Sequence, residues 1–217
     1  MRLANLCHLA VLLCGISGSA MAEDYATLLA RIKAADFSID FRSLRLAYTQ
    51  TPAYHPNSGV SLSFRKRVQS ALANKDYGGA VKAADEWLAV EYVNPFAHLG
   101  AARAHDALGA AEQARFHHRV ADGLYNSICL PGQGLSATAP CQVISLDEEH
   151  FYLARHQFEV GGQYEETCLV DKPCSVYEVR EPNSEVLHDI HFDVSVPFAY
   201  QQARGQVPAT TPAVPSH

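Results

Sequence analysis

Two adjacent histidines and an aspartate lie close together in the segment FHHRVADGL, which spans positions 116–124. An imidazole titrates near neutral pH and can therefore take up or release a proton during a reaction, and a nearby carboxylate can orient it. His117, His118 and Asp122 are thus of the right types for general acid–base chemistry. Whether they perform it depends on the element that positions them.

The string His-His-x-x-x-Asp-Gly resembles the catalytic signature of the chloramphenicol acetyltransferase and condensation-domain acyltransferases, in which a histidine is the general base. Those enzymes hold the signature after a strand, within alternating α/β sequence, and nothing upstream predicts such a sheet in this chain. In a helix, adjacent side chains point about 100° apart, whereas His118 and Asp122 lie four residues apart on one face. We therefore interpret the string as a solvated His118–Asp122 pair. His117, His118 and Asp122 would be the catalytic candidates only if the chain is an enzyme.

Helical periodicity dominates the sequence from position 23 to about 128. Leu28 and Ile32 fall on one face of a first short helix, and Asp40 is placed to cap a second. The segment TPAYHPNSG, with two prolines and a glycine, then breaks the pattern. Residues 61–128 have the pattern of two helical hairpins.

These hairpins resemble tetratricopeptide repeats, in which small residues let antiparallel helices approach and large apolar residues fill the space between them. Only two units are present and their period is irregular, so helical hairpins are the firmer expectation. The resemblance rests on Asn74-Lys75-Asp76-Tyr77 before Ala80, on Pro95, and on Leu99-Gly100 before Ala107-Leu108-Gly109.

A different pattern begins after the helical region. A Gly/Pro loop, CLPGQGLSATAPC, precedes a predicted strand at Gln142–Leu146, and Asp147 can cap a short helix. Cys174–Arg180 and His188–Pro197 alternate and predict an antiparallel hairpin with one apolar face. We expect an α+β fold, mostly helical hairpins followed by a small antiparallel β appendage. The expected organisation is a signal peptide (1–22), a helical-hairpin region (23–128), a small α+β region (129–200) and a disordered tail (201–217).

The first residues have the features of a secretory signal peptide. Arg2 precedes the apolar run LANLCHLAVLLCGI, and Ala20-Met21-Ala22 has the pattern of a cleavage site. The run is too short to span a bilayer, and a lipoprotein signal would need a small residue where Leu13 precedes Cys14. We expect cleavage after Ala22 and a periplasmic or secreted protein that does not span the membrane.

Four of the six cysteines lie beyond the predicted cleavage site. None forms a C-x-x-C pair, and an even number in an exported chain favours disulfides. Four cysteines allow three connectivities. The pairing local in sequence is Cys129–Cys141 with Cys168–Cys174.

Several stretches resemble a bacterial family of unknown function, domain-of-unknown-function family 4919, over residues 25–198. They are DFSIDFRSLRLAYTQTPAYHP, ADGLYNSI, GLSATAPCQVISLDEEHFYL and VYEVREPNSEVLHDIHFDVSVPF. The resemblance implies an exported protein of helical hairpins with a small β appendage and brings no activity with it. It also implies that Asp122-Gly123 belongs to a helix ending. The two cysteine pairs depart from the family's pattern.

Other residues could bind metals or protons. His98 and His105 lie seven apart on one helix face, with His117 or His118 on the next helix, and imidazoles facing each other across a hairpin can bind zinc or copper. No tight ligand spacing occurs, so we predict no metal site and no cofactor.

Two further groups receive structural interpretations. Asp147-Glu148-Glu149 is typical of a helix start, where the macrodipole favours carboxylates. A calcium or glycosidase site would need further carboxylates converging on it. His191 and Asp193 share one face of the last strand, and we expect that face to be solvated.

The balance of charge limits the partners. The formal net charge is −6, which argues against nucleic acid because such partners need a basic face. Arg103, Arg115 and Arg119 could form a stripe that binds an acidic peptide segment, or could be solvated helix residues. We expect a periplasmic protein-interaction or scaffold module without catalysis, with an unknown protein or peptide partner. The alternatives are an enzyme using His117 and His118, or a histidine-based metal-binding protein.

Overall fold

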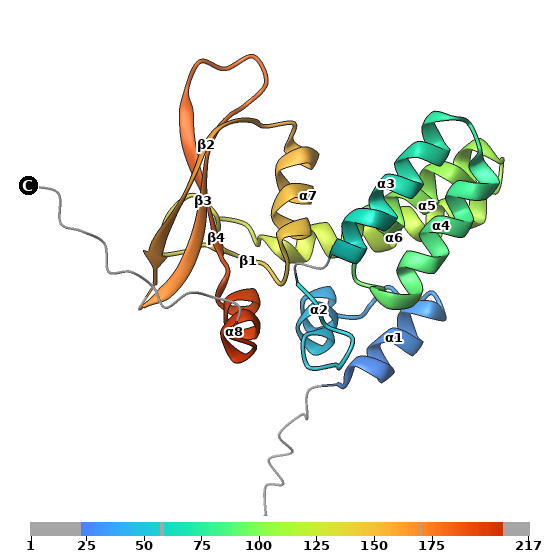
Figure 1. Cartoon of the computed structure of the whole chain (residues 1–217), viewed down its shortest axis with the longest axis horizontal. Coiled ribbons are helices and arrows are strands. Elements are labelled where there is room, and N and C mark those ends of the chain that lie inside the picture. The colour runs from blue at the N-terminus through green and yellow to red at the C-terminus, as the bar shows by residue number, and fades with distance from the viewer. Residues whose placement is uncertain (1–22, 57–58, 170, 206–217) are drawn as a thin grey trace, which may run out of the picture.

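The computed structural model of the chain describes residues 23–56, 59–169 and 171–205. The predicted signal peptide and residues 206–217 of the predicted tail lie outside the described residues. Within them the chain forms eight helices and one four-stranded sheet, which confirms the α+β class. Figure 1 shows the sheet on one side, the helices α3–α6 on the other, and α7 between them.

Six helices make up the first part of the chain. Their bounds are α1 Tyr25–Lys33, α2 Phe41–Tyr48, α3 Gly59–Ala73, α4 Tyr77–Val90, α5 Pro95–Ala107 and α6 Ala111–Ile128. Side chains cap the starts of four of them, because Asp24, Asp40, Asp76 and Asn94 each accept hydrogen bonds from backbone N–H groups that have no partner within the helix. The two predicted hairpins are α3–α4 and α5–α6 (Figure 1).

Close contacts in this part of the molecule depend on glycine. A Cβ on Gly100 would lie 2.6 Å from Cγ1 of Val68, so α5 can approach α3 only because position 100 has no side chain. Likewise, a Cβ on Gly123 would lie 2.4 Å from Cζ of Phe41. The glycine of the Asp-Gly pair therefore makes room for the Phe41 ring at the start of α2.

The second part of the chain forms a sheet with one helix between its first two strands. The elements are β1 Cys141–Gln142, α7 Leu146–His156, β2 Glu159–Cys168, β3 Lys172–Arg180, β4 Leu187–Asp193 and α8 Ser195–Ala203. The predicted antiparallel hairpin is confirmed as β3–β4. The sheet as a whole is mixed, however, because the order is β1-β4-β3-β2 and β1 runs parallel to β4. A strand of only two residues has no alternation from which its direction could be predicted.

Several elements differ from the sequence expectation. The strand expected at Gln142–Leu146 is only Cys141–Gln142, and the N-cap residue of α7 is Ser145 and not Asp147.

The sequence predicts no strand at residues 159–168, but β2 lies there, and its register with β3 shifts between Val160 and Gly162. A bulge of this kind suits glycine. The predicted strand His188–Pro197 ends at Asp193, whose carboxylate accepts a 2.9 Å hydrogen bond from Ser195 N at the start of α8.

The expectation of a solvated face for His191 and Asp193 is wrong. Their side chains are buried, with 8% and 3% of the residue surface exposed. The loop between α6 and β1 covers His191, since Gly134 O accepts a 2.8 Å hydrogen bond from its backbone N–H. Asp193 pairs with Lys172 at 3.2 Å.

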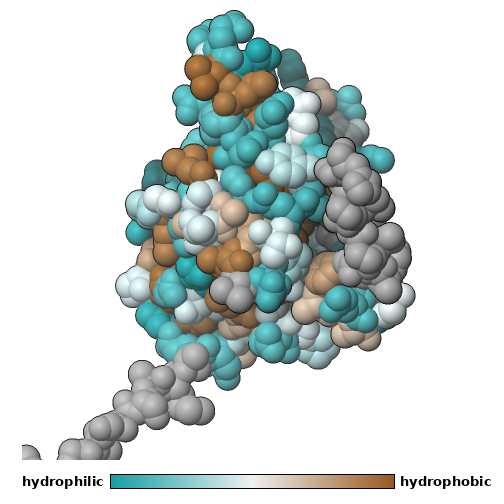
Figure 2. All heavy atoms as spheres, turned by 90° about the vertical axis from the view of Figure 1, so that its left-hand side faces the viewer, coloured by the Kyte–Doolittle hydropathy of each residue, from teal (hydrophilic) through white to brown (hydrophobic). Residues whose placement is uncertain are grey.

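The outer side of the sheet is polar. β2 is an edge strand whose residues are mostly exposed, and it carries Glu159, Glu165 and Glu166. Figure 2 shows this side as largely hydrophilic, with hydrophobic residues in separate small patches. Charged side chains on an edge strand discourage pairing with other chains.

Both predicted disulfides are present, Cys129–Cys141 and Cys168–Cys174. The first links the end of α6 to β1. Gly134 lies against it with a φ of 90°, and a Cβ at this position would lie 2.7 Å from Cys141 Sγ. The disulfide and the positive φ together fix the loop that covers β4.

We predict that replacing Cys129 and Cys141 together by Ser lowers the free energy of unfolding by about 2–3 kcal/mol, because the unfolded chain regains the entropy of the open loop. Urea unfolding of the wild type and the double variant measures this difference. An unchanged midpoint under oxidising conditions would contradict the prediction, and the double variant should lose most of its sensitivity to a reductant.

A buried ion pair connects the two parts of the chain. Arg45 on α2 donates to Glu148 on α7 from Nε (2.6 Å) and from the terminal nitrogen Nη2 (2.5 Å), and both residues are 1% exposed. The same guanidinium donates to the carbonyl oxygens of Ser127 and Gln142 at 2.7 Å. The carboxylate also accepts from Ile144 N at 2.8 Å. The pair is therefore fully hydrogen-bonded as well as neutralised.

Replacement of Arg45 by Met should destabilise the fold by about 3–5 kcal/mol, since it leaves an ionised carboxylate buried without its partner. The double variant Arg45→Met/Glu148→Leu should recover part of that loss, because no charge then remains in the core. Chemical denaturation of both variants tests the comparison. A double variant less stable than the single one would show that the ion pair is not the main source of the effect.

Candidate functional site

The His-His-x-x-x-Asp-Gly string does not form one site. His118 Nε2 lies 2.8 Å from Asp106 Oδ2 on α5, and Asp122 instead pairs with Arg155 on α7 at 3.2 Å. The predicted His118–Asp122 pair is therefore replaced by two pairs with other helices. His117 points away from both and into the contact between α5 and α6.

His117 and His98 form a hydrogen-bonded pair whose tautomers follow from its partners. His98 Nε2 lies 2.8 Å from the carbonyl oxygen of Tyr92 and must carry the proton, since a carbonyl only accepts. Its Nδ1 then accepts from His117 Nδ1 at 3.0 Å. Burial is the main cause that lowers the pKa of His98 to about 3, and the neighbouring imidazole of His117 adds to this effect. Burial is also the main cause that lowers the pKa of His117 to about 4. Both rings are neutral at physiological pH.

The histidine cluster is a polar contact between α5 and α6. His105 stacks on His117 with ring centroids 5.6 Å apart, and its buried Nδ1 has no hydrogen-bond partner among the described residues. Within residues 23–56, 59–169 and 171–205, no group of three or more His, Cys, Asp or Glu side chains is arranged to hold a metal ion. His98 and His105 on α5 thus each contact His117 on α6.

The three arginines proposed as a basic stripe have different surroundings. Arg119 lies over the ring of Phe37, 3.8 Å from its centroid, and Arg115 pairs with Glu112 within α6. Arg103 lies on α5 beside a shallow depression against α3. Arg119 therefore has a packing role of its own.

A pocket of about 340 Å³ opens where α2, α3 and α4 meet; we call it the α2–α4 pocket. This size falls within the range of small-molecule sites, about 300–1,000 Å³. Val60 and Val90 are 55% and 49% exposed and lie at its wall. Its lining residues are Tyr48, Ala53, His55, Val60, Ser61, Trp87, Val90 and Glu91.

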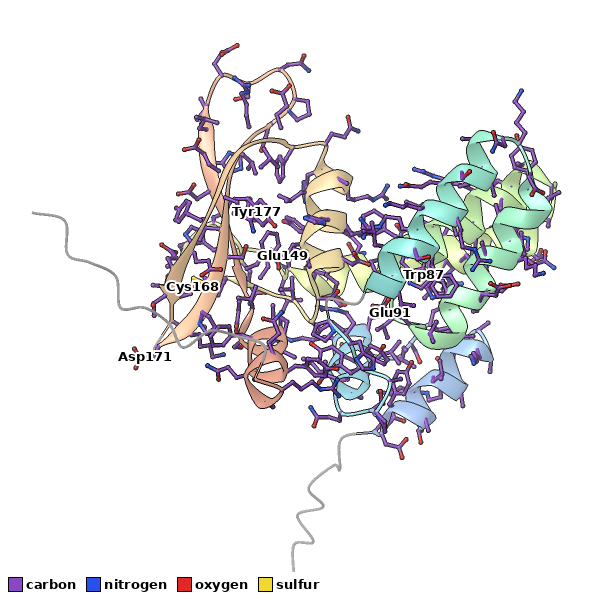
Figure 3. All side chains as sticks on the ribbon, viewed as in Figure 1. Trp87, Glu91, Glu149, Cys168, Asp171 and Tyr177 are labelled. Carbon is purple, nitrogen blue, oxygen red and sulfur yellow. A yellow bond between two sulfur atoms is a disulfide. The ribbon has the colours of Figure 1, made fainter. Side chains whose placement is uncertain are left out.

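Glu91 is the acidic group of this pocket. Its Oε2 accepts hydrogen bonds from Ser61 Oγ at 2.6 Å, Trp87 Nε1 at 3.1 Å and Asn94 Nδ2 at 3.1 Å. Trp87 lies one helical turn before Glu91, so both side chains are on the same side of α4 at its C-terminal end. Figure 3 shows the two residues near each other at the end of the α3–α4 hairpin that faces α1 and α2.

A second carboxylate lies behind the pocket. Asp147 on α7 accepts from Asn94 Nδ2 at 2.8 Å and forms an ion pair with Arg65. Its Oδ2 also lies 3.1 Å from Ser61 Oγ. Burial chiefly raises the pKa of Glu91, and the charge of Asp147 adds to this effect, while the hydrogen bonds to Oε2 act in the opposite direction. Glu91 is therefore a carboxylate whose charge is stabilised only by neutral donors.

Sequence reasoning did not single out Glu91. The available signals were Trp87 at position i−4 and Asn94-Pro95, which cap the next helix immediately after it. No pattern in the sequence indicates that Ser61 and Asp147, from α3 and α7, converge on the same point.

Another buried carboxyl lies between α7 and the sheet. Glu149 and Tyr177 are each 3% exposed, and Figure 3 shows Glu149 on α7 directed toward Tyr177 on β3. The two groups are close enough to affect each other's ionisation, yet neither Glu149 Oε2 nor the Tyr177 hydroxyl completes a hydrogen bond of normal geometry among the described residues. Burial raises the pKa of Glu149 to about 7, against the opposing effect of the Ser175 and Tyr177 hydroxyls.

Comparisons with protein-family models, curated proteins and solved structures find no match to this chain. Among the helices that the structure describes, none is long and apolar enough to cross a membrane. Function must therefore be argued from the geometry above.

The variant Glu149→Gln should gain stability relative to the wild type as the pH rises. Glu149 is protonated in the folded chain below about pH 7 but ionises above about pH 4.5 when unfolded, so its contribution to the unfolding free energy is present at low pH and lost as the pH rises through 7. Between pH 5 and pH 8 the difference between the two proteins should change by up to about 3 kcal/mol in favour of the variant.

Urea unfolding of both proteins across this pH range gives the measurement. His98 and His117 have lowered pKa values, so they decrease stability as the pH falls below about 6.5, but they do so equally in both proteins. A difference that stays constant with pH would contradict the assignment of Glu149.

Proposed function

We propose that the mature chain is an exported, non-catalytic binding module whose binding site is the α2–α4 pocket. Export is supported by the signal-peptide pattern with cleavage after Ala22 and by the two disulfides, which suit an oxidising compartment such as the periplasm. Membership of domain-of-unknown-function family 4919 is part of the same proposal. The expected protein-interaction role and the tetratricopeptide-like character of the hairpins are consistent with it.

One observation carries the proposal. The α2–α4 pocket combines mostly apolar walls with a single carboxylate, Glu91, and a wall in which Val60 and Val90 are about half exposed. Binding sites are commonly apolar hollows with a few polar groups that orient the ligand. Aliphatic side chains at a concave surface are in contact with water. A ligand that covers them lowers the free energy of the system.

The two alternatives from the sequence receive less support. An acyltransferase-like site would need His117, His118 and Asp122 to converge, but they contact three different partners. A metal-binding protein would need a set of converging ligands, and the part of the chain that the structure describes holds no group of three.

The single tryptophan of the chain gives a direct test. Trp87 is the only Trp in the sequence and lines the pocket, and its indole N–H donates to Ser61 and Glu91. A screen of small amines, alcohols, carboxylates and peptides should therefore yield compounds that change its fluorescence and the NMR resonance of its indole N–H.

Replacing Val90 by Arg should place a long side chain across the pocket and weaken such binding about tenfold or more, the equivalent of about 1.4 kcal/mol. Leu62→Arg is the matched control, since Leu62 is 50% exposed on α3 but does not line the pocket. If no compound affects Trp87, or if Val90→Arg binds as the wild type does, the pocket is not the binding site.

A further inference from the structure

Resting on the proposed function of the α2–α4 pocket, we propose that its ligand is a small organic amine, with an ammonium N–H donating to Oε1 of Glu91 and an apolar body against Tyr48 and Trp87. A primary or secondary ammonium fits because the free carboxylate oxygen is a hydrogen-bond acceptor.

The two oxygens of Glu91 have different surroundings. All three hydrogen bonds to the carboxylate reach Oε2, and their donors are a hydroxyl, an indole and an amide. Oε1 receives no hydrogen bond from any residue that the structure describes, and Glu91 lines the pocket. Oε1 does not belong to the buried side-chain atoms that lack a partner, so it is accessible from the pocket, where a charged donor is the strongest partner it can have.

The charge around Glu91 is incompletely balanced. Arg65, the guanidinium of this network, pairs with Asp147 and lies over the ring of Phe96, 4.1 Å from its centroid. It therefore neutralises Asp147 and not Glu91. Two carboxylates joined through Ser61 and Asn94 share one cation, so a second cation entering from the pocket would complete the balance.

The walls suit a cation that carries an apolar group. Tyr48 and Trp87 line the pocket, and the Tyr25 ring packs against Tyr48 with centroids 5.5 Å apart. Tyr48 and Trp87 are only 3% and 1% exposed, so they offer a small apolar contact surface at the base of the pocket. The aliphatic side chains of Val60 and Val90 can cover the rest of the ligand.

Other ligand classes fit less well. Glu91 would repel a carboxylate or phosphate. A hydrated or oxygen-liganded metal ion needs six or more oxygen ligands, whereas most of the pocket wall is apolar. A neutral alcohol could donate one hydrogen bond to Oε1 but would leave the negative charge unbalanced.

Binding should be coupled to the ionisation of Glu91. A protonated Glu91 cannot pair with a cation, and burial raises its pKa, so it takes up a proton at a higher pH than an exposed carboxyl group does. Affinity for the amine should therefore increase with pH as this proton is lost. The other titratable groups facing this region are Tyr25, Tyr48, Tyr54, His55, Arg65 and Asp147.

Titration with a matched pair of compounds tests the proposal. 2-Phenylethylamine and 2-phenylethanol have nearly the same size and shape, and only the first carries a positive charge. We expect the amine to change Trp87 fluorescence with an affinity about tenfold or more above that of the alcohol, as for a hydrogen bond to a charged group. The wild-type preference should increase with pH as Glu91 loses its proton.

Two variants distinguish the effect of the Glu91 carboxylate from the effect of a change in the net charge of the protein. Glu91→Gln should abolish the preference for the amine, whereas Glu86→Gln, on the same helix and paired with Arg67 at the surface, should retain it. The wild-type comparison and its pH profile stand even if Glu91→Gln does not fold. Equal affinity for the two compounds would overturn the amine proposal and leave the pocket as a site for apolar groups.

If neither compound binds while other compounds of the screen still affect Trp87, the ligand class is wrong and the proposed binding function stands. If nothing in the screen binds, both proposals fail.

Discussion

The buried pair Arg45–Glu148 determines how the two parts of the chain are arranged. Its guanidinium contacts the end of α6 through Ser127, the end of β1 through Gln142, and α7 through Glu148, so four elements meet at one side chain. A buried ion pair is a weak source of net stability, but one that satisfies this many groups allows few other arrangements of them. The start of α7 is fixed against α2 and α6 as a result (Figure 1).

The position of α7 in turn gives three consecutive carboxylates three different roles. Asp147 faces the helices and joins the Glu91 network, Glu148 pairs with Arg45, and Glu149 faces Tyr177 in the sheet. In a helix, successive side chains point about 100° apart. Because α7 lies between the helices and the sheet, three consecutive carboxylates can face the helices, the sheet and the contact between the two. The macrodipole favours carboxylates at this helix start but does not determine these contacts.

This explains which features could be predicted from the sequence. The periodicity of Leu28 and Ile32 and the cap at Asp40 are local signals, and the helices and the β3–β4 hairpin followed from signals of that kind. β2 is exposed along most of its length and has no apolar alternation, so it was missed. The site was missed for another reason: Ser61 and Glu91 lie 30 residues apart, and Asn94 and Asp147 lie 53 apart. Only the packing of α3, α4 and α7 brings them together.

A comparison of Glu91 with the buried Glu148 and Glu149 shows why Glu91 is the one to associate with a ligand. Burying a carboxylate requires a cation, protonation or hydrogen-bond donors. Glu148 has a cation and donors, and Glu149 is kept neutral up to about pH 7. Glu148 is fully hydrogen-bonded within the fold, whereas Oε2 of the neutral Glu149 has no hydrogen-bond partner among the described residues. Glu91 has three donors on one oxygen and, among the described residues, none on the other, which belongs to a pocket. Because Glu91 lines the α2–α4 pocket, a cation from outside can reach this second oxygen and balance its charge.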